Sequence, residues 1–200
     1  MTDLETILEL HEGSARTAAL AAWVQELYSK GSPRPVLVGG AAVELLTGGA
    51  YTTGDLDFVG EVPSDVESKL KEHGFERHGR HWVHEKGQIF LEFPGDRLEA
   101  PETSLEINFD GSIVEILSPE AVLVDRLASW AFWHSEVDAL NAVLLWRATE
   151  RSLDRKILRE LVRQRKLEET WEEFLRFMDS VSDRKPTEEE LEKWIRDSRH

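Results

Sequence analysis

The sequence predicts an α+β (α/β) protein in which a mixed β-sheet flanked by helices is followed by a C-terminal helical bundle. Short apolar or alternating runs, typical of strands, recur before residue 117 between helical patterns and turns. From Ser118 onward the pattern is helical almost to the end. A hydrophobic content of 40% over 200 residues suffices for one good-sized core or two small ones. We therefore expect an α/β domain at residues 1–117 and a helical region at 118–200.

The first elements set out the order helix, strand, glycine turn, helix and strand. Helical periodicity over residues 4–28 predicts one helix, which ends at a segment rich in helix breakers. Val36–Val38 is a short apolar run of the kind buried in a sheet, and Gly39–Gly40 leads directly from it into helix-forming residues 41–46. After a Gly- and Thr-rich loop, residues 55–59 alternate acidic and apolar side chains, as a half-buried strand does.

The remaining elements complete the sheet and begin the bundle. The patterns predict a helix at 64–73, a hairpin of strands at 82–84 and 88–93, and a second hairpin at 105–109 and 113–116. Asp110-Gly111 is a strong turn signal for the second hairpin. Ser118 is suited to the N-cap and Pro119 to the first helical position of the next helix.

Composition narrows the kind of site and partner. The formal charge of −15 lies in residues 1–150, which hold 11 basic and 26 acidic groups. This excess disfavours nonspecific binding of nucleic acid by that part and favours a small or locally presented substrate. Cysteine is absent, so any metal must be bound by oxygen or imidazole. The sequence shows neither a secretory signal pattern nor an apolar run long enough to span a bilayer, and we expect a cytoplasmic protein.

Asp55 and Asp57 are the first candidate metal ligands. In an extended strand, residues i and i+2 project from one face, which places the two side chains about 7 Å apart. At that distance two carboxylates repel by roughly 2 to 3 kcal/mol at an effective dielectric near 20, so a cation favours keeping both ionised. Mg²⁺ (or Mn²⁺) suits the pair, because Mg²⁺ takes oxygen ligands and is commonly shared between carboxylates and substrate phosphates.

Gly39 and Gly40 are candidate phosphate-binding residues. A glycine turn at the end of a strand allows the following helix to aim its unpaired N–H groups at a phosphate. Each feature is weak alone, since Gly-Gly also serves as a tight turn and Asp-x-Asp as a pair of solvated strand residues. Their order along the chain is more restrictive and predicts a phosphate cradle next to a metal site.

Two stretches resemble the DNA polymerase β-like nucleotidyltransferase superfamily, in its minimal prokaryotic form. They are VLVGGAAVELLTGGAYTTGDLDFVG, residues 36–60, and ILSPEAVLVDRLASWAFWHSEVDALNAVLLWRA, residues 116–148, and the second is similar to one uncharacterised branch. The resemblance implies a nucleotidyltransferase-type sheet, Mg²⁺ binding and an NTP as substrate. Its relatives include antitoxin-like proteins of toxin–antitoxin pairs and toxins that modify tRNA.

The resemblance also implies residues beyond the aspartate pair. The superfamily usually has a third carboxylate on an adjacent strand, and Glu92, an acid among apolar neighbours, is our candidate for metal ligand and catalytic residue, with Glu106 and Glu115 as rivals. In the helix after the sheet, Arg126 is a candidate for binding nucleotide phosphate. The residues that could support the site are Asp125, His134 and Asp138, for which an ordinary structural role is the alternative.

We therefore expect a Mg²⁺-dependent nucleotidyltransferase that acts on a hydroxyl acceptor in RNA or protein. The alternative is a non-catalytic binding or regulatory module on the same fold, such as an antitoxin-like partner. Arg155, Arg159 and Arg163 recur at i, i+4 spacing on one helix. Such a stripe is typical of a solvated face, and it could also bind tRNA or an acidic partner protein.

Overall fold

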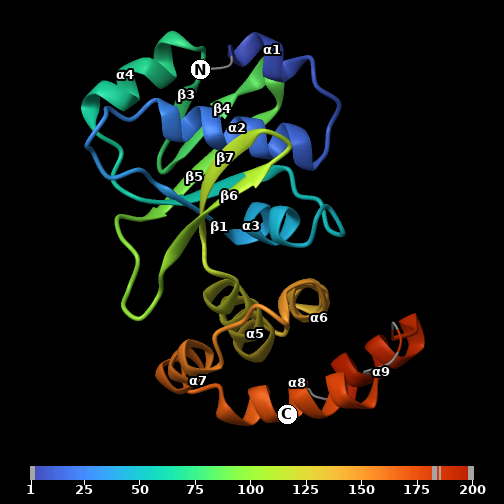
Figure 1. Cartoon of the computed structure of the whole chain (residues 1–200). Coiled ribbons are helices and arrows are strands. Elements are labelled where there is room, and N and C mark those ends of the chain that lie inside the picture. The colour runs from blue at the N-terminus through green and yellow to red at the C-terminus, as the bar shows by residue number, and fades with distance from the viewer. Residues whose placement is uncertain (1–2, 182–183, 185, 198–200) are drawn as a thin grey trace. The chain divides into compact units, whose positions relative to one another are not determined.

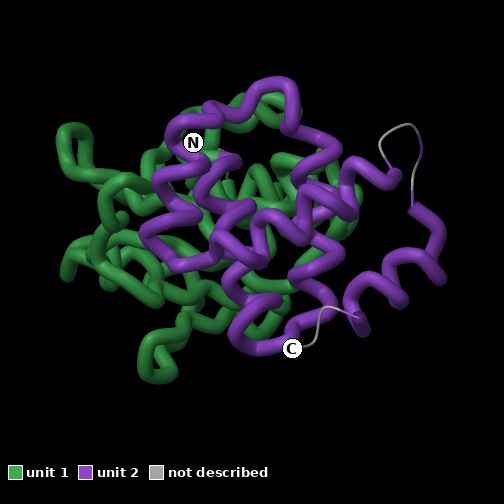
Figure 2. Tube along the Cα trace, turned by 90° about the horizontal axis from the view of Figure 1, so that it is seen from below, with its two compact units in different colours: residues 1–118 green, residues 119–200 purple. Residues whose placement is uncertain are grey.

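The computed structural model describes residues 3–181, 184 and 186–197. The chain forms two compact units, residues 1–118 and 119–200 (Figure 2). In the first unit the helices are α1 (Leu4–Leu8), α2 (Ser14–Glu26), α3 (Gly39–Leu46) and α4 (Ser64–Glu72). Its strands are β1 (Val36–Val38), β2 (Asp55–Val59), β3 (Glu76–His78), β4 (His81–His84), β5 (Ile89–Gly95), β6 (Ser104–Phe109) and β7 (Ser112–Leu117).

The strands form one mixed sheet in the order β3-β4-β5-β2-β1-β7-β6 (Figure 1). The central strand β2 runs antiparallel to β1 and parallel to β5, while β1 runs parallel to β7. The two hairpins, β4 with β5 and β6 with β7, are antiparallel and lie on opposite sides of this centre. The predicted fold class, a mixed sheet with flanking helices followed by C-terminal helices, is confirmed.

The two faces of the central strands differ in chemistry. Leu56 and Phe58 of β2 are buried, together with Leu37 of β1 and Leu91 of β5. Helix α2 packs against β7, and α3 packs against β1 and β2. Because side chains alternate along a strand, the acidic residues of β2 project from the opposite face. Burial of the apolar face therefore fixes the direction in which the acidic residues point.

The N-terminal segment departs from the predicted single helix over residues 4–28. The helix ends at Leu8 and a new one begins at Ser14, after Gly13 adopts φ = +135°. That backbone angle lies outside the right-handed helical region and is accessible mainly to glycine, so the periodic pattern is interrupted there. Strand β3 was also not predicted, and its three residues are all exposed, which leaves no alternating pattern to detect.

The second unit consists of helices. They are α5 (Pro119–Trp133), α6 (Glu136–Thr149), α7 (Arg155–Gln164), α8 (Glu168–Ser180) and α9 (Glu188–Asp197). Helix α5 begins at Pro119 as predicted, and it contacts α6, α7 and α8. Aromatic pairs join the later helices, including Trp146 with Phe174 at 5.7 Å between ring centroids and Phe177 with Trp194 at 4.4 Å. Among the described helices, none combines the length and apolarity needed to cross a membrane.

Gln25 of α2 joins the residue before β1 to β7 through its side-chain amide. Its Nε2 donates to the carbonyl oxygens of Pro35 at 2.9 Å and Glu115 at 2.7 Å, and its Oε1 accepts from the backbone N–H of Glu115 at 2.9 Å. The side chain is buried. It therefore satisfies three backbone groups where the parallel pairing of β1 with β7 is short.

We predict that Gln25→Leu lowers the free energy of unfolding by about 3 kcal/mol or more, because buried backbone groups would lose their partners. Gln88→Leu makes the same exchange at an exposed side chain and should change the free energy of unfolding by less than about 0.5 kcal/mol. Denaturant unfolding of both variants measures the difference. Equal stability of the two variants would contradict the role given to Gln25.

Candidate active site

The register of the central strands brings the predicted acidic residues together. Asp57 is the Cα partner of Val38 on β1 and of Glu92 on β5. Paired residues on neighbouring strands lie about 4.8 Å apart and share a face, so Glu92 lies beside Asp57. Asp55 lies two residues earlier on the same face and is exposed, whereas Asp57 is half-buried. The three predicted carboxylate residues therefore lie on one face of two adjacent strands.

Gly39 lies against the carboxylate of Asp57. A Cβ added at Gly39 would stand 2.2 Å from Asp57 Oδ2, and Gly39 has φ = +65°. Gly39 is also the first residue of α3, whose N-cap residue is Val38. The valine side chain has no atom that could accept a hydrogen bond from the first turn of the helix. The glycine turn and the aspartate strand thus meet at the start of α3.

The carboxylate of Glu92 is held by two side chains from the neighbouring hairpin. Arg80 Nε lies 2.6 Å from Oε1, and His81 Nδ1 lies 3.4 Å from Oε2. Within the described part of the chain, no group of three or more His, Asp or Glu side chains is arranged to hold a metal ion. Mg²⁺ commonly uses only one or two carboxylates together with phosphates, which fits Asp55 and Asp57. The role of Glu92 as a third ligand or catalytic residue stays a prediction.

The rival acids Glu106 and Glu115 lie elsewhere in the sheet. They are Cα partners on β6 and β7, and β1 separates β7 from β2. Glu106 is 3.8 Å from Arg34, and Ser104 donates to Glu115 at 2.8 Å. Among the three candidates, Glu92 is the one that the register places next to Asp57.

Glu44 of α3 is a site residue that sequence reasoning missed. It is completely buried, and it accepts hydrogen bonds from Thr17 Oγ1 and from the backbone N–H of Thr53, each at 3.2 Å. Thr53 Oγ1 in turn accepts from the N–H of Asp55 at 3.4 Å. The only signal in the sequence is a lone acid within the apolar helix 41–46. Glu44 anchors the loop from which the aspartate strand begins.

Arg126 and its neighbours form an ion cluster within the helical unit. Its terminal nitrogens lie 2.5 Å from Asp125 Oδ2 and 2.6 Å from Asp138 Oδ1. Burial by itself lowers the pKa of Arg126, but the charges and hydrogen bonds of Asp125 and Asp138 outweigh it and leave the pKa raised. The guanidinium is therefore engaged by two carboxylates. Its predicted contact with nucleotide phosphate remains untested.

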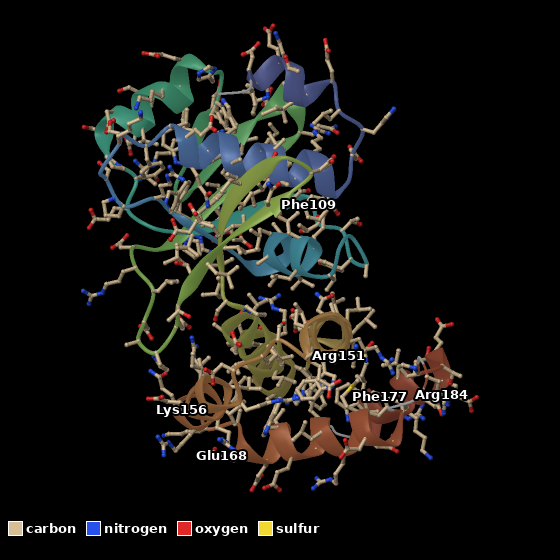
Figure 3. The ribbon with its side chains drawn as sticks, in the orientation of Figure 1. Phe109, Arg151, Lys156, Glu168, Phe177 and Arg184 are labelled. Carbon is tan, nitrogen blue, oxygen red and sulfur yellow. The ribbon has the colours of Figure 1, made fainter. Side chains whose placement is uncertain are left out.

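The other candidates in the helical unit are exposed. His134 follows the last residue of α5 and has φ = +53°. Arg155, Arg159 and Arg163 lie along the exposed side of α7, and Lys156 lies at the outer surface of the same helix (Figure 3). Arg155 also stacks over Trp146 at 4.6 Å and lies 3.7 Å from Glu150. The basic stripe is present on α7, and its predicted binding of tRNA or a partner protein remains a prediction.

Solved structures provide the comparison for this arrangement. An antigenic nucleotidyltransferase-like protein from Paracoccidioides brasiliensis matches with a TM-score of 0.53 and 19% identity, over 80% of this chain and 94% of that one. The fold is nucleotidyltransferase-like. The antibiotic-resistance factor ANT(2'')-Ia matches with a TM-score of 0.47 and 20% identity, over 80% of this chain and 90% of that one. No protein-family model matches the sequence, and no curated protein does.

We predict that Gly39→Ala disturbs the candidate site beyond the cost of its backbone angle. Gly48 has nearly the same φ, +64°, but a Cβ there would meet nothing within 4 Å. Both substitutions should cost about 1 to 2 kcal/mol of stability for the left-handed conformation. Only Gly39→Ala should also displace Asp57, because its new methyl group would overlap the carboxylate.

The two glycine variants can be separated by unfolding measurements and by ¹⁵N NMR of the Asp57 amide. A large shift of that amide in Gly39→Ala, with little change in Gly48→Ala, is the expected result. Equal shifts in both variants would show that Gly39 is needed only for its backbone conformation.

We predict that Glu44→Gln is tolerated and Glu44→Ala is not. Glutamine can still accept from the N–H of Thr53 and can donate to the Thr17 hydroxyl, so its stability should stay within about 1 kcal/mol of the wild type. Alanine leaves the part-buried N–H of Thr53 without this acceptor and creates a void, at a cost of about 2 to 4 kcal/mol. Denaturant unfolding tests both variants, and a stable Glu44→Ala protein would refute the anchoring role.

Proposed function

We propose that this protein transfers a nucleotidyl group from an NTP to a hydroxyl acceptor, with Mg²⁺ or Mn²⁺ as cofactor. The observation that carries the proposal is the contact between Asp57 and Gly39, which joins the acidic strand to the start of α3. Carboxylates for a metal and backbone N–H groups for phosphates thereby lie next to each other. The fold shared with a nucleotidyltransferase-like protein is consistent with this proposal.

In this proposal each residue has a separate task. Gly39 and Gly40 let the phosphates approach the first turn of α3, where the helix dipole favours negative charge. Asp55 and Asp57 hold the metal, which when bound supplies positive charge that offsets the phosphates. Asp55 is exposed and Asp57 half-buried, so the pair can be reached from solvent within the sheet unit. Thr53 and Glu44 position Asp55 through the loop.

Glu92 would take part in the reaction only after its carboxylate has released Arg80. Its carboxylate now contacts Arg80 and His81, so it would reach the metal or the acceptor hydroxyl only after Arg80 moves away. Arg80 lies in the exposed turn between β3 and β4, where its side chain is 66% exposed and can move without disrupting the core. In this proposal Asp55 and Asp57 would hold the metal, and Glu92 would act as the catalytic carboxylate beside them.

The test is calorimetric titration of the wild type and an Asp55→Asn/Asp57→Asn variant with ATP, GTP, CTP and UTP, each with Mg²⁺ and then with Mn²⁺. We expect metal-dependent binding of at least one NTP, weakened by about tenfold or more in the variant, equivalent to 1.4 kcal/mol or more. Asparagine keeps the size of aspartate, and denaturant unfolding checks that the variant is folded.

Glu106→Gln serves as the control, since it removes one acid from the same sheet away from Asp57. Its NTP binding should match the wild type. If the folded wild type binds no NTP with either metal, the enzyme proposal fails and a non-catalytic module, such as an antitoxin-like partner, becomes the better explanation.

A further inference from the structure

A cavity of about 700 Å³ opens beside Asp55 in the sheet unit. Its walls come from the start of α2, from α3, from the loop before β2 and from the first residues of β2 and β5. Pockets that bind small molecules usually measure about 300 to 1,000 Å³, so this volume suits a compound rather than a macromolecule. The cavity is thus large enough for a substrate and touches one of the proposed metal ligands.

The loop before β2 separates this cavity from the glycine turn. A Cβ on Gly40 would stand 3.1 Å from Thr53 Oγ1 and 3.5 Å from the ring of Tyr51, so the loop lies against the turn. Thr52, Thr53 and Gly54 of the same loop line the cavity. The described residues of the cavity wall include Asp55 but not Gly39, Gly40 or Asp57. A molecule in the cavity would therefore lie beside Asp55, next to the loop that also contacts the glycine turn.

We propose that this cavity binds the acceptor, and that the acceptor is a small hydroxyl compound that is neutral or positively charged. The inference rests on the proposed function. In nucleotidyl transfer the acceptor oxygen forms a bond to the α-phosphorus, the bond to the β-phosphate oxygen breaks, and pyrophosphate leaves while the hydroxyl proton passes to water. The attacking and leaving oxygens lie roughly in line on opposite sides of phosphorus. With the leaving phosphates at the glycine turn, the acceptor enters from the cavity.

The charges of the cavity wall indicate the class of acceptor. Two exposed acidic residues, Glu12 and Asp55, line the cavity together with one guanidinium, that of Arg16. Arg16 already donates to the carbonyl oxygen of Gly87 at 2.7 Å and lies 3.8 Å from Glu12. The wall is therefore acidic in sum and repels phosphorylated or carboxylated compounds, RNA included. The same carboxylates can accept hydrogen bonds from hydroxyl and ammonium groups.

The wall also offers both polar and apolar contacts. Leu20, Leu56 and Ile89 are buried side chains of the wall, while Phe90 is 44% exposed beside them. Glu44 is completely buried and its two oxygens accept from Thr17 and Thr53, so it fixes this part of the wall without reordering of the side chain. This combination of apolar surface with a few fixed polar groups is typical of sites for small molecules.

Three probes of similar size and different charge test the proposal: ethylene glycol, ethanolamine and glycolate. Each is titrated into the ¹⁵N-labelled full chain, and amide shifts are followed at the cavity and at the glycine turn. We expect ethanolamine and ethylene glycol to shift the amide signals of Thr53, Gly54 and Gln88. Glycolate should bind with an affinity lower by roughly threefold to tenfold. In Glu12→Arg, a charge reversal at an exposed position, the preference should move towards glycolate.

Cavity shifts that are missing for all three probes, or a preference of the wild type for glycolate, would overturn the proposal. Amide shifts centred on Gly39 and Gly40 would also overturn the proposal. Calorimetry with Mg²⁺ and NTP is run on the same samples. Cavity binding in the expected order without NTP binding would leave the pocket in place and reject the proposed transferase, so the two failures are distinguishable.

Transfer is tested by pyrophosphate release with ethylene glycol as acceptor in the wild type and in Thr52→Trp. The exchange introduces a much larger side chain at an exposed position of the cavity wall. We expect acceptor-dependent release to fall by about tenfold or more while the Kd for NTP is unchanged. Unchanged release in a folded Thr52→Trp protein would place the acceptor elsewhere, and equal loss of NTP binding would show that the cavity belongs to the nucleotide.

Discussion

The contact between Asp57 and Gly39 is the constraint on which the site depends. The carboxylate of Asp57 lies against the backbone of the turn at Gly39. The turn residue must therefore lack a side chain, and it must adopt a positive φ. Because β1 and β2 are antiparallel, the end of one strand and the beginning of the other meet at the same place. The arrangement of the candidate site follows from this meeting of a glycine turn with an acidic strand.

Around that contact, polar groups hold the parts in position. Glu44 fastens the loop that leads to Asp55, and Gln25 joins the residue before β1 to β7 on the other side of the sheet centre. Buried polar groups are stable only when their hydrogen bonds are satisfied, so such links favour one arrangement of chain segments over others. The apolar face of the sheet supplies the general stability, and these links specify the local geometry near the aspartates.

Local patterns in the sequence were sufficient for most of the fold and for the centre of the candidate site. Alternation in residues 55–59 predicted which side chains of that strand are buried, since period-two alternation is a direct property of strand geometry. The glycine turn, the hairpin around Asp110-Gly111 and the helix beginning at Pro119 were also predicted from nearby residues. Periodicity could not reveal that the helical segment is divided, because the division depends on the backbone: the first helix ends at Leu8, and Gly13, with φ = +135°, directly precedes the second.

The sequence by itself determined the fold class, the order of its elements and the acidic pair beside a glycine turn, because these features depend on neighbours along the chain. Tertiary structure decided that Glu92 lies beside Asp57, that Arg80 holds its carboxylate, and that Glu44 anchors the loop. It also decided the engagement of Arg126 by Asp138 and the presence of the cavity. These features depend on strand register and on side chains far apart in sequence, about which local periodicity carries no information.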